Sequence, residues 1–126
     1  MPHAIMYNPE EHVIEIKVQE DLTLNKVKEI ISEAIQVAKV QNCFLILNDM
    51  REATVKLSTV EIYELPKIIP DIFASSGLNV HQFKRALVAA KDLNDYKFFE
   101  TVTLNHAQNA KFFTDIDKAR KWLIGK

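Results

Sequence analysis

The sequence predicts an α/β fold in which helices cover a parallel sheet, and two observations lead to this prediction. The runs 44–47 and 86–90 are apolar on both faces, as buried strands of such a sheet are. Each run ends in a short polar cluster that opens an amphipathic segment, so strands and helices alternate. We therefore expect these runs to be adjacent, parallel, central strands. With 126 residues, 48% of them hydrophobic, the chain has the size of one domain, residues 1–126.

The N-terminal part is predicted to be a β-hairpin followed by a crossover helix. Asn8 and Pro9 separate two β-prone runs, 4–7 and 12–19. In the second run apolar and polar residues alternate, which buries one face and places this strand nearer the sheet edge than the later strands. The apolar residues of segment 23–39 then follow helical spacing.

A second helix is predicted to begin at Ser58. Ser58 and Glu61 form the S-x-x-E pattern of a capping box. Pro66 lacks an amide donor and clashes with the preceding turn, so we expect a break or kink near Leu65. A second helical piece then runs from Pro66 toward Ser75.

The C-terminal half continues the alternation of strands and helices. Its predicted elements are a strand at 85–90, a helix at about 93–107, a short strand at 111–113 and a last helix at 115–124, which Gly125 ends.

Composition excludes several classes of protein. The formal net charge is −1 and neither sign forms a long block, so nucleic acid is not an expected partner. The single cysteine, Cys43, opens an apolar run and fits a reducing compartment. The N-terminus lacks the features of a signal peptide, and no run approaches the ~20 apolar residues that span a bilayer. We expect a cytoplasmic protein without a transmembrane segment.

No motif of catalysis, metal binding or cofactor binding is present in the sequence. The four histidines are scattered, without the spacing of a metal site. There is no G-x-S-x-G pattern, and the two glycines cannot form a Gly-rich phosphate loop. The sequence therefore indicates neither a metal nor a cofactor.

Polar side chains follow the ends of the predicted strands. Ligands of open α/β sheets usually bind beyond the carboxyl ends of the strands, so this edge is a candidate site for a ligand or partner. Its residues are Asn48, Asp49, Arg51, Lys91, Asp92, Thr114 and Asp115, with Ser58 at a helix start. We favour a structural role for these residues over a binding role, because such residues also cap helices and close turns.

Two chemical interpretations of this edge remain open. Asp49 and Lys91 resemble the phospho-acceptor aspartate and the lysine of phosphoryl transfer, but no nucleophile and base have diagnostic spacing. The helix start at Ser58 offers amide donors to an anion, although Ser58 and Glu61 can satisfy those donors themselves. We favour the capping role.

The predicted helix near residue 93 carries a broad apolar arc, formed by Tyr96, Phe98, Phe99 and Val102. This arc is wider than packing on one sheet face requires, so we expect self-association, most simply as a two-fold dimer. The alternative is that Phe98 covers the rim of its own core.

Three stretches of the chain resemble one family. They are Asp49-Met50-Arg51-Glu52-Ala53-Thr54 through Pro66, Arg85-Ala86-Leu87-Val88, and Phe113-Thr114-Asp115 through Ala119 to Trp122-Leu123. With the order of elements, they are similar to the SpoIIAA-like group of small bacterial proteins, relatives of STAS domains and of the CRAL-TRIO fold. The resemblance implies a mostly parallel sheet of four to five strands, with an N-terminal hairpin and helices packed around it.

The resemblance also implies a non-enzymatic binding or regulatory module. In the anti-sigma-factor antagonists of this fold, a partner kinase phosphorylates a serine of a D-S-S-G-type motif at a helix start. This chain has no D-S-S-G, and Ser58 and Thr59 are only the positional analogues of that serine.

A carrier of a small apolar or lipid-like ligand is the alternative that the CRAL-TRIO resemblance allows. Its pocket would lie between the sheet and the helix that contains Pro66, Ile68, Ile69, Pro70, Ile72 and Phe73. An enzyme that uses Asp49 and Lys91 is the third interpretation.

Overall fold

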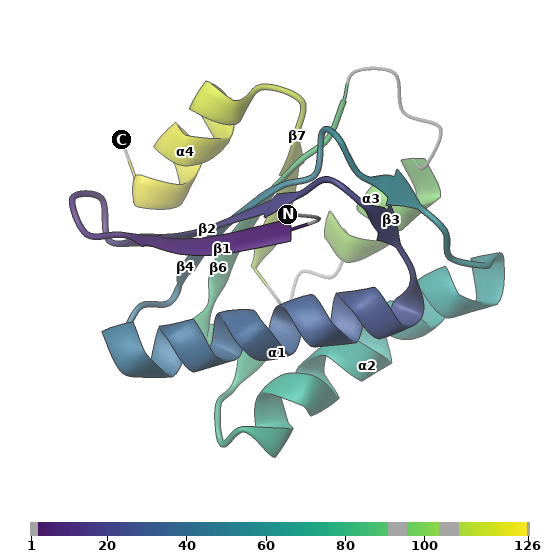
Figure 1. Cartoon of the computed structure of the whole chain (residues 1–126), viewed down its shortest axis with the longest axis horizontal. Helices are drawn as coiled ribbons and strands as arrows, with labels where there is room; N and C mark the ends of the chain where they lie inside the picture. Colours follow the sequence, from purple (N-terminus) through teal and green to yellow (C-terminus); the bar gives the residue numbers. More distant parts are fainter. Residues whose placement is uncertain (1–2, 91–95, 104–108, 126) are drawn as a thin grey trace.

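Five strands form the central sheet of the computed structural model, which describes residues 3–90, 96–103 and 109–125 (Figure 1). In sheet order the strands are β1 (His3–Asn8), β2 (Val13–Val18), β4 (Leu45–Asp49), β6 (Lys84–Val88) and β7 (Ala110–Phe113). The helices are α1 (Leu24–Gln41), α2 (Thr59–Ser75), α3 (Tyr96–Thr103) and α4 (Ile116–Ile124). Helix α4 lies on one face of the sheet, and α1, α2 and α3 lie on the other.

Strands β1 and β2 form the predicted N-terminal hairpin. They pair antiparallel, with Ile5 opposite Ile16. In the turn, the Asn8 Oδ1 atom accepts hydrogen bonds from the amides of Glu10 and Glu11. A turn this short can join only antiparallel strands, whereas β2, β4, β6 and β7 pair in parallel. The sheet is therefore mixed, which corrects the prediction of a mostly parallel sheet.

Strands β4 and β6 are parallel neighbours in the interior of the sheet, as predicted. Leu47 lies opposite Ala86, and the pair is flanked by β2 and β7. Strand β2 is second from one edge, in agreement with its alternating pattern. Strand β7 forms the other edge, so the prediction that β2 lies nearer an edge than every later strand is wrong for β7.

Helix α1 matches the predicted crossover helix. The Thr23 hydroxyl caps its N-terminus by accepting a hydrogen bond from the amide of Lys26. Asn42, with φ of 49°, adopts the left-handed conformation that ends the helix. Most of the predicted apolar stripe is buried against the sheet and α2, and its members Leu24 and Ile31 are partly buried.

Helix α2 is continuous from Thr59 to Ser75, with Pro66 and Pro70 inside it, so the predicted break into two pieces is wrong. The prolines are four residues apart and therefore lie on the same side of the helix. Leu65 and Ile69 are buried beside them. Burial of Leu65 and Ile69 stabilises the helical turns around the prolines, although each proline removes one amide donor.

Helices α3 and α4 lie where the sequence predicts helices. The Asp115 carboxylate caps α4 by accepting hydrogen bonds from the amides of Asp117 and Lys118. Gly125 ends α4 with φ of 78°, a conformation that glycine adopts without strain. The remainder of the helix predicted at 93–107 lies outside the described residues.

Two short strands were not predicted from the sequence. Strands β3 (Asp21–Leu22) and β5 (Thr54–Val55) pair in parallel as a second, two-stranded sheet. Two residues are too few to show a hydrophobic period. A 3₁₀ turn, η1 (Val80–Gln82), precedes β6 and was not predicted either.

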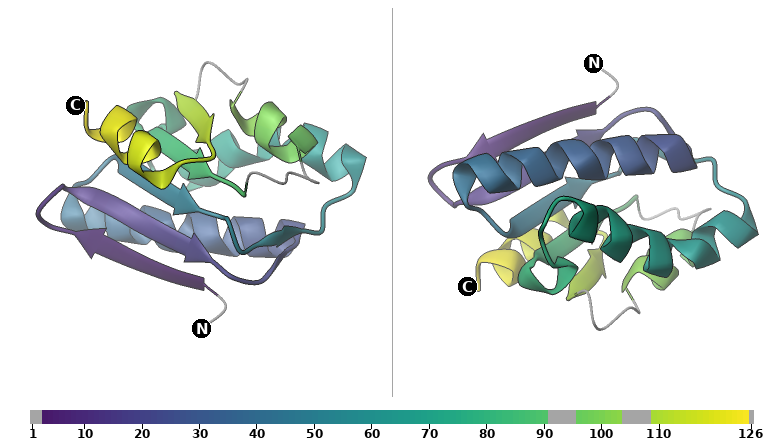
Figure 2. Two further views of the ribbon diagram at one scale, coloured as in Figure 1. Left: turned by 90° about the horizontal axis from the view of Figure 1, so that it is seen from above. Right: turned by 90° about the horizontal axis from the view of Figure 1, so that it is seen from below.

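The hydrophobic core has two parts, one on each face of the sheet. On the face of α1, α2 and α3, the rings of Phe73 and Phe83 pack edge to face with centroids 4.7 Å apart. Helices α1 and α2 lie side by side over this part, as the right-hand view of Figure 2 shows. On the opposite face, Leu47 packs in a smaller cluster with Leu123 of α4.

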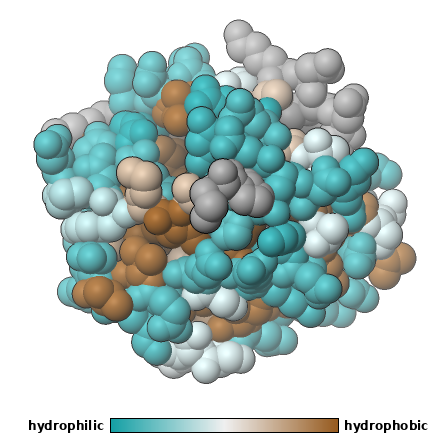
Figure 3. Space-filling view, viewed as in Figure 1, coloured by the Kyte–Doolittle hydropathy of each residue, from teal (hydrophilic) through white to brown (hydrophobic). Residues whose placement is uncertain are grey.

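Hydrophilic residues cover most of the face seen in Figure 3, and hydrophobic areas lie between them near its centre. No helix within the described ranges is long and apolar enough to cross a bilayer.

Candidate functional site

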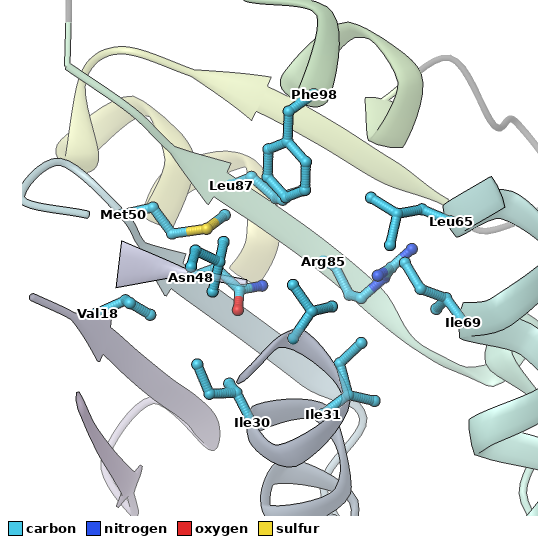
Figure 4. Close-up of a pocket in the computed structure, with 12 residues that line it drawn as sticks. Val18, Ile30, Ile31, Asn48, Met50, Leu65, Ile69, Arg85, Leu87 and Phe98 are labelled. Carbon is cyan, nitrogen blue, oxygen red and sulfur yellow. The ribbon is translucent and has the colours of Figure 1, made fainter. Parts of the chain in front are cut away.

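An apolar cavity lies between the sheet and helices α1, α2 and α3 (Figure 4). Its volume is about 60 Å³. The described residues that line it are Val18, Leu22, Val27, Ile30, Ile31, Asn48, Met50, Leu65, Ile69, Arg85, Leu87 and Phe98. They come from both sheets and from three helices, so elements that are distant in the sequence build one cavity. Concave, mainly apolar sites with few polar groups are typical of small-ligand sites.

Two polar side chains, Asn48 and Arg85, stand out in this lining. Asn48 is on β4 opposite Leu87, and Arg85 is on β6 opposite Ile46. Because side chains alternate along a strand, Asn48 and Arg85 share the face that α1 and α2 cover. Figure 4 shows Arg85 extending from β6 toward Leu65 of α2.

Arg85 is buried, with 5% of its surface exposed. Burial lowers the pKa of its guanidinium to about 10, because a low-dielectric surrounding disfavours the charged form. The group therefore still carries a positive charge at neutral pH. Arginine is rarely buried in this way, because removing its charge from water is costly.

A second, smaller cavity of about 40 Å³ adjoins the first. Asn48 and Arg85 line both cavities, together with Ile30 and Ile31 of α1. The second cavity reaches Phe73 of α2. The two polar side chains therefore lie where the cavities meet.

This cavity occupies the general place predicted for an apolar pocket, between the sheet and α2. Among the six α2 residues predicted to form it, Ile69 lines the first cavity and Phe73 the second. The other four, Pro66, Ile68, Pro70 and Ile72, are not among the described lining residues.

The predicted site residue Asp49 lies elsewhere. It follows Asn48 on β4, so its side chain points to the face of α4, where it lines a hollow of about 190 Å³ with Lys17. The Arg51 guanidinium donates to both Asp49 carboxylate oxygens, with Nε to Oδ1 and Nη2 to Oδ2 distances of 2.8 Å. Arg51 thereby lowers the pKa of Asp49. A carboxylate held in this way is a weak base and a poor nucleophile.

Four other residues predicted for the site divide into two groups. Ser58 and Thr59 start α2, beyond β5, where the Ser58 side chain and amide hydrogen-bond Glu61. Lys91 and Asp92 lie outside the described residues, so their place beside Asp49 stays a prediction. Within the described ranges, no three His, Cys, Asp or Glu side chains are grouped as a metal site requires.

Ser58 forms both hydrogen bonds of the predicted capping box. Its hydroxyl accepts from the amide of Glu61 at 3.1 Å, and the Glu61 carboxylate accepts from the amide of Ser58 at 2.9 Å. Thr59 is the exposed first residue of the helix. The side chains of Ser58 and Glu61 thus satisfy donors that an anion would otherwise bind.

The Ser58→Ala variant is therefore expected to lose ~1 kcal/mol of unfolding free energy, because the helix loses its cap. Ser58→Asp should be close to neutral, since aspartate caps equally well. Urea denaturation of both variants measures the difference. Equal destabilisation by alanine and aspartate, or stoichiometric phosphate on Ser58 in protein from the native cells, would contradict the capping role.

Two aromatic side chains predicted for self-association are buried within the chain. Phe98 is 4% exposed and Phe99 is 3% exposed. Their rings pack edge to face with centroids 5.0 Å apart, and Phe99 stacks on Phe112 at 5.2 Å. The core therefore accounts for this part of the apolar arc. The side chains of Tyr96 and Val102 lie outside the described residues, and the dimer stays a prediction.

Arg85 is the residue of the cavity that the sequence reasoning missed as a functional candidate. The sequence carried a signal for it, because a basic residue begins the predicted strand 85–90, whose other residues are all apolar. A charge at such a position lies either at a strand end or inside the protein. The structure shows the second case.

Comparison with solved structures finds a similar protein, an uncharacterized member of the DUF3478 family with a SpoIIAA-like fold from Shewanella loihica PV-4. The similarity covers 96% of this chain and 91% of that one, with 18% sequence identity and a TM-score of 0.58. Neither a family model nor a curated protein sequence matches the chain. At this identity the likeness concerns the fold alone, and it confirms the resemblance drawn from the sequence: the chain is an α/β protein with a SpoIIAA-like fold.

Proposed function

We propose that this protein is a non-enzymatic binding module that holds a small apolar ligand in the cavity between the sheet and α1, α2 and α3. The observation that carries the proposal is the lining of this cavity, which is apolar except for Asn48 and Arg85 among the described residues. A SpoIIAA-like fold also favours a STAS-like binding or regulatory module. The pairing of Asp49 with Arg51 favours a role without catalysis, because it occupies the carboxylate that an enzyme would use.

The test is native mass spectrometry of the protein purified from its own cells. We expect a small extra mass on the wild-type chain. Leu87→Phe should remove this mass, because Leu87 lines the cavity and a larger side chain fills it. Leu45→Phe is the matched control, because Leu45 packs in the cluster on the face of α4. Retention of the mass by Leu87→Phe would contradict the proposal.

Regulation through a protein partner is the second candidate function. It is favoured by Val60 and Tyr63, which are 67% and 58% exposed in the first turns of α2, beside Ser58 and Thr59. Exposed apolar residues that lie one helical turn apart are frequent in protein contacts. In the same mass spectra, a bound protein in place of a small molecule would support this candidate.

A further inference from the structure

The cavity combines two properties that rarely occur together. Its described wall is apolar except for Asn48, and it contains one buried cation, Arg85. A guanidinium presents its N–H donors in a planar fork that matches a carboxylate. In a site of low dielectric, such a pair is stronger than the same pair in water.

We propose that the ligand of this cavity is a small monoanion with an apolar body, whose carboxylate binds Arg85 while its hydrocarbon contacts the aliphatic wall. This inference rests on the proposed function, because it names the chemistry of the ligand that the cavity binds. The Asn48 amide lies on the neighbouring strand and is the other polar group that lines both cavities.

The size of the cavities limits the ligand. One water molecule needs roughly 10–15 Å³ of such volume, so a cavity of about 60 Å³ has room for a group as large as several waters. A short aliphatic chain meets this limit. Its end can extend along α1, where Ile30 and Ile31 line both cavities.

The test is a titration of the isotope-labelled full chain, followed by amide chemical shifts, with four probes. Hexanoate carries the proposed head and body, hexanol has the body without the charge, hexylammonium has the opposite charge, and acetate has the head without the body. We expect hexanoate to bind roughly 10-fold or more tightly than hexanol, since a charged hydrogen bond supplies a difference of this order. Hexylammonium should bind more weakly than hexanol, because it has the wrong charge. Acetate should bind more weakly than hexanoate, because it lacks the apolar body.

Variants of Arg85 then assign the preference to one side chain. In Arg85→Met, which keeps an unbranched apolar stem and removes the charge, hexanoate should bind no more tightly than hexanol. Arg85→Lys should keep a reduced preference for hexanoate, because it keeps the charge and loses the planar fork. The comparison of hexanoate with hexanol on the wild-type chain tests the inference even where a variant fails to fold.

The outcomes separate this inference from the proposed function. Equal binding of hexanoate and hexanol to the wild-type chain would overturn the anion inference and leave the apolar cavity as a binding site. An unchanged preference for hexanoate in Arg85→Met would overturn the role of Arg85. Absence of binding by all four probes, together with no small mass on the native protein, would overturn both proposals.

Discussion

Replacing Phe98 with alanine is expected to lower the unfolding free energy by ~3–5 kcal/mol, the range measured for large buried aromatic residues. Phe98 is 4% exposed, packs on Phe99 and forms part of the cavity wall. Its removal deletes apolar contacts and enlarges an existing cavity, so neighbouring side chains cannot close the space at little cost. Urea denaturation with circular dichroism measures the change.

Tyr63 provides the matched control for this prediction. It is an aromatic residue of α2 with 58% of its surface exposed, so Tyr63→Ala should change the unfolding free energy by less than ~0.5 kcal/mol. A similar small change in Phe98→Ala would show that Phe98 is not part of the core.

Sedimentation of the wild-type chain tests the predicted dimer separately, and a monomer at micromolar concentration would contradict that prediction.

Replacing Arg120 with methionine is expected to cost ~1–3 kcal/mol of unfolding free energy, the range for hydrogen bonds to charged groups. Arg120 of α4 donates to the carboxylate of Glu11 at 2.6 Å and to both oxygens of Glu15 at 3.1 and 3.2 Å. These side chains are only about one quarter to one third exposed, so water weakens the bonds in part. Lys118→Met, an exposed cation of the same helix, should be nearly neutral.

The unfolding free energy that Arg120→Met loses should become smaller as the pH falls. The hydrogen bonds from Arg120 lower the pKa of Glu15 below its ordinary value of 4.5. The carboxylate therefore stabilises the folded state fully above that value, and the stabilisation is lost as the pH falls through the lowered pKa. Wild type and Arg120→Met should differ at neutral pH and converge in acid. A difference that stays constant with pH would contradict the ionic origin of the effect.

The sequence predicts most elements of this fold because their signals are local. Ser58 and Asp115 mark helix starts by the chemistry of their side chains, and their caps form as predicted. The break into two helical pieces near Leu65 was predicted wrongly because the effect of Pro66 is local, whereas the burial of Leu65 and Ile69 that holds α2 together is tertiary. A two-residue strand such as β3 is too short to show an alternation of apolar and polar residues.

The candidate site was harder to predict than the fold. Asn48 and Asp49 are adjacent in the sequence, yet the alternation of β4 sends them to opposite faces of the sheet. The predicted site included the Asp49 carboxylate as its chemical group, whereas the Asn48 amide lines the cavity. Arg85 comes to Asn48 only through the pairing of β4 with β6, and no sequence spacing records that register.

The two prolines of α2 make this helix unstable in isolation. Each internal proline disfavours an isolated helix by ~3 kcal/mol, more than other residues of one turn can recover. A peptide of residues 59–75 should therefore be largely non-helical in water, where short helices are marginal even without proline. The wall of the cavity that contains Leu65 and Ile69 thus acquires its shape only from packing on the rest of the fold, chiefly on α1 and α3.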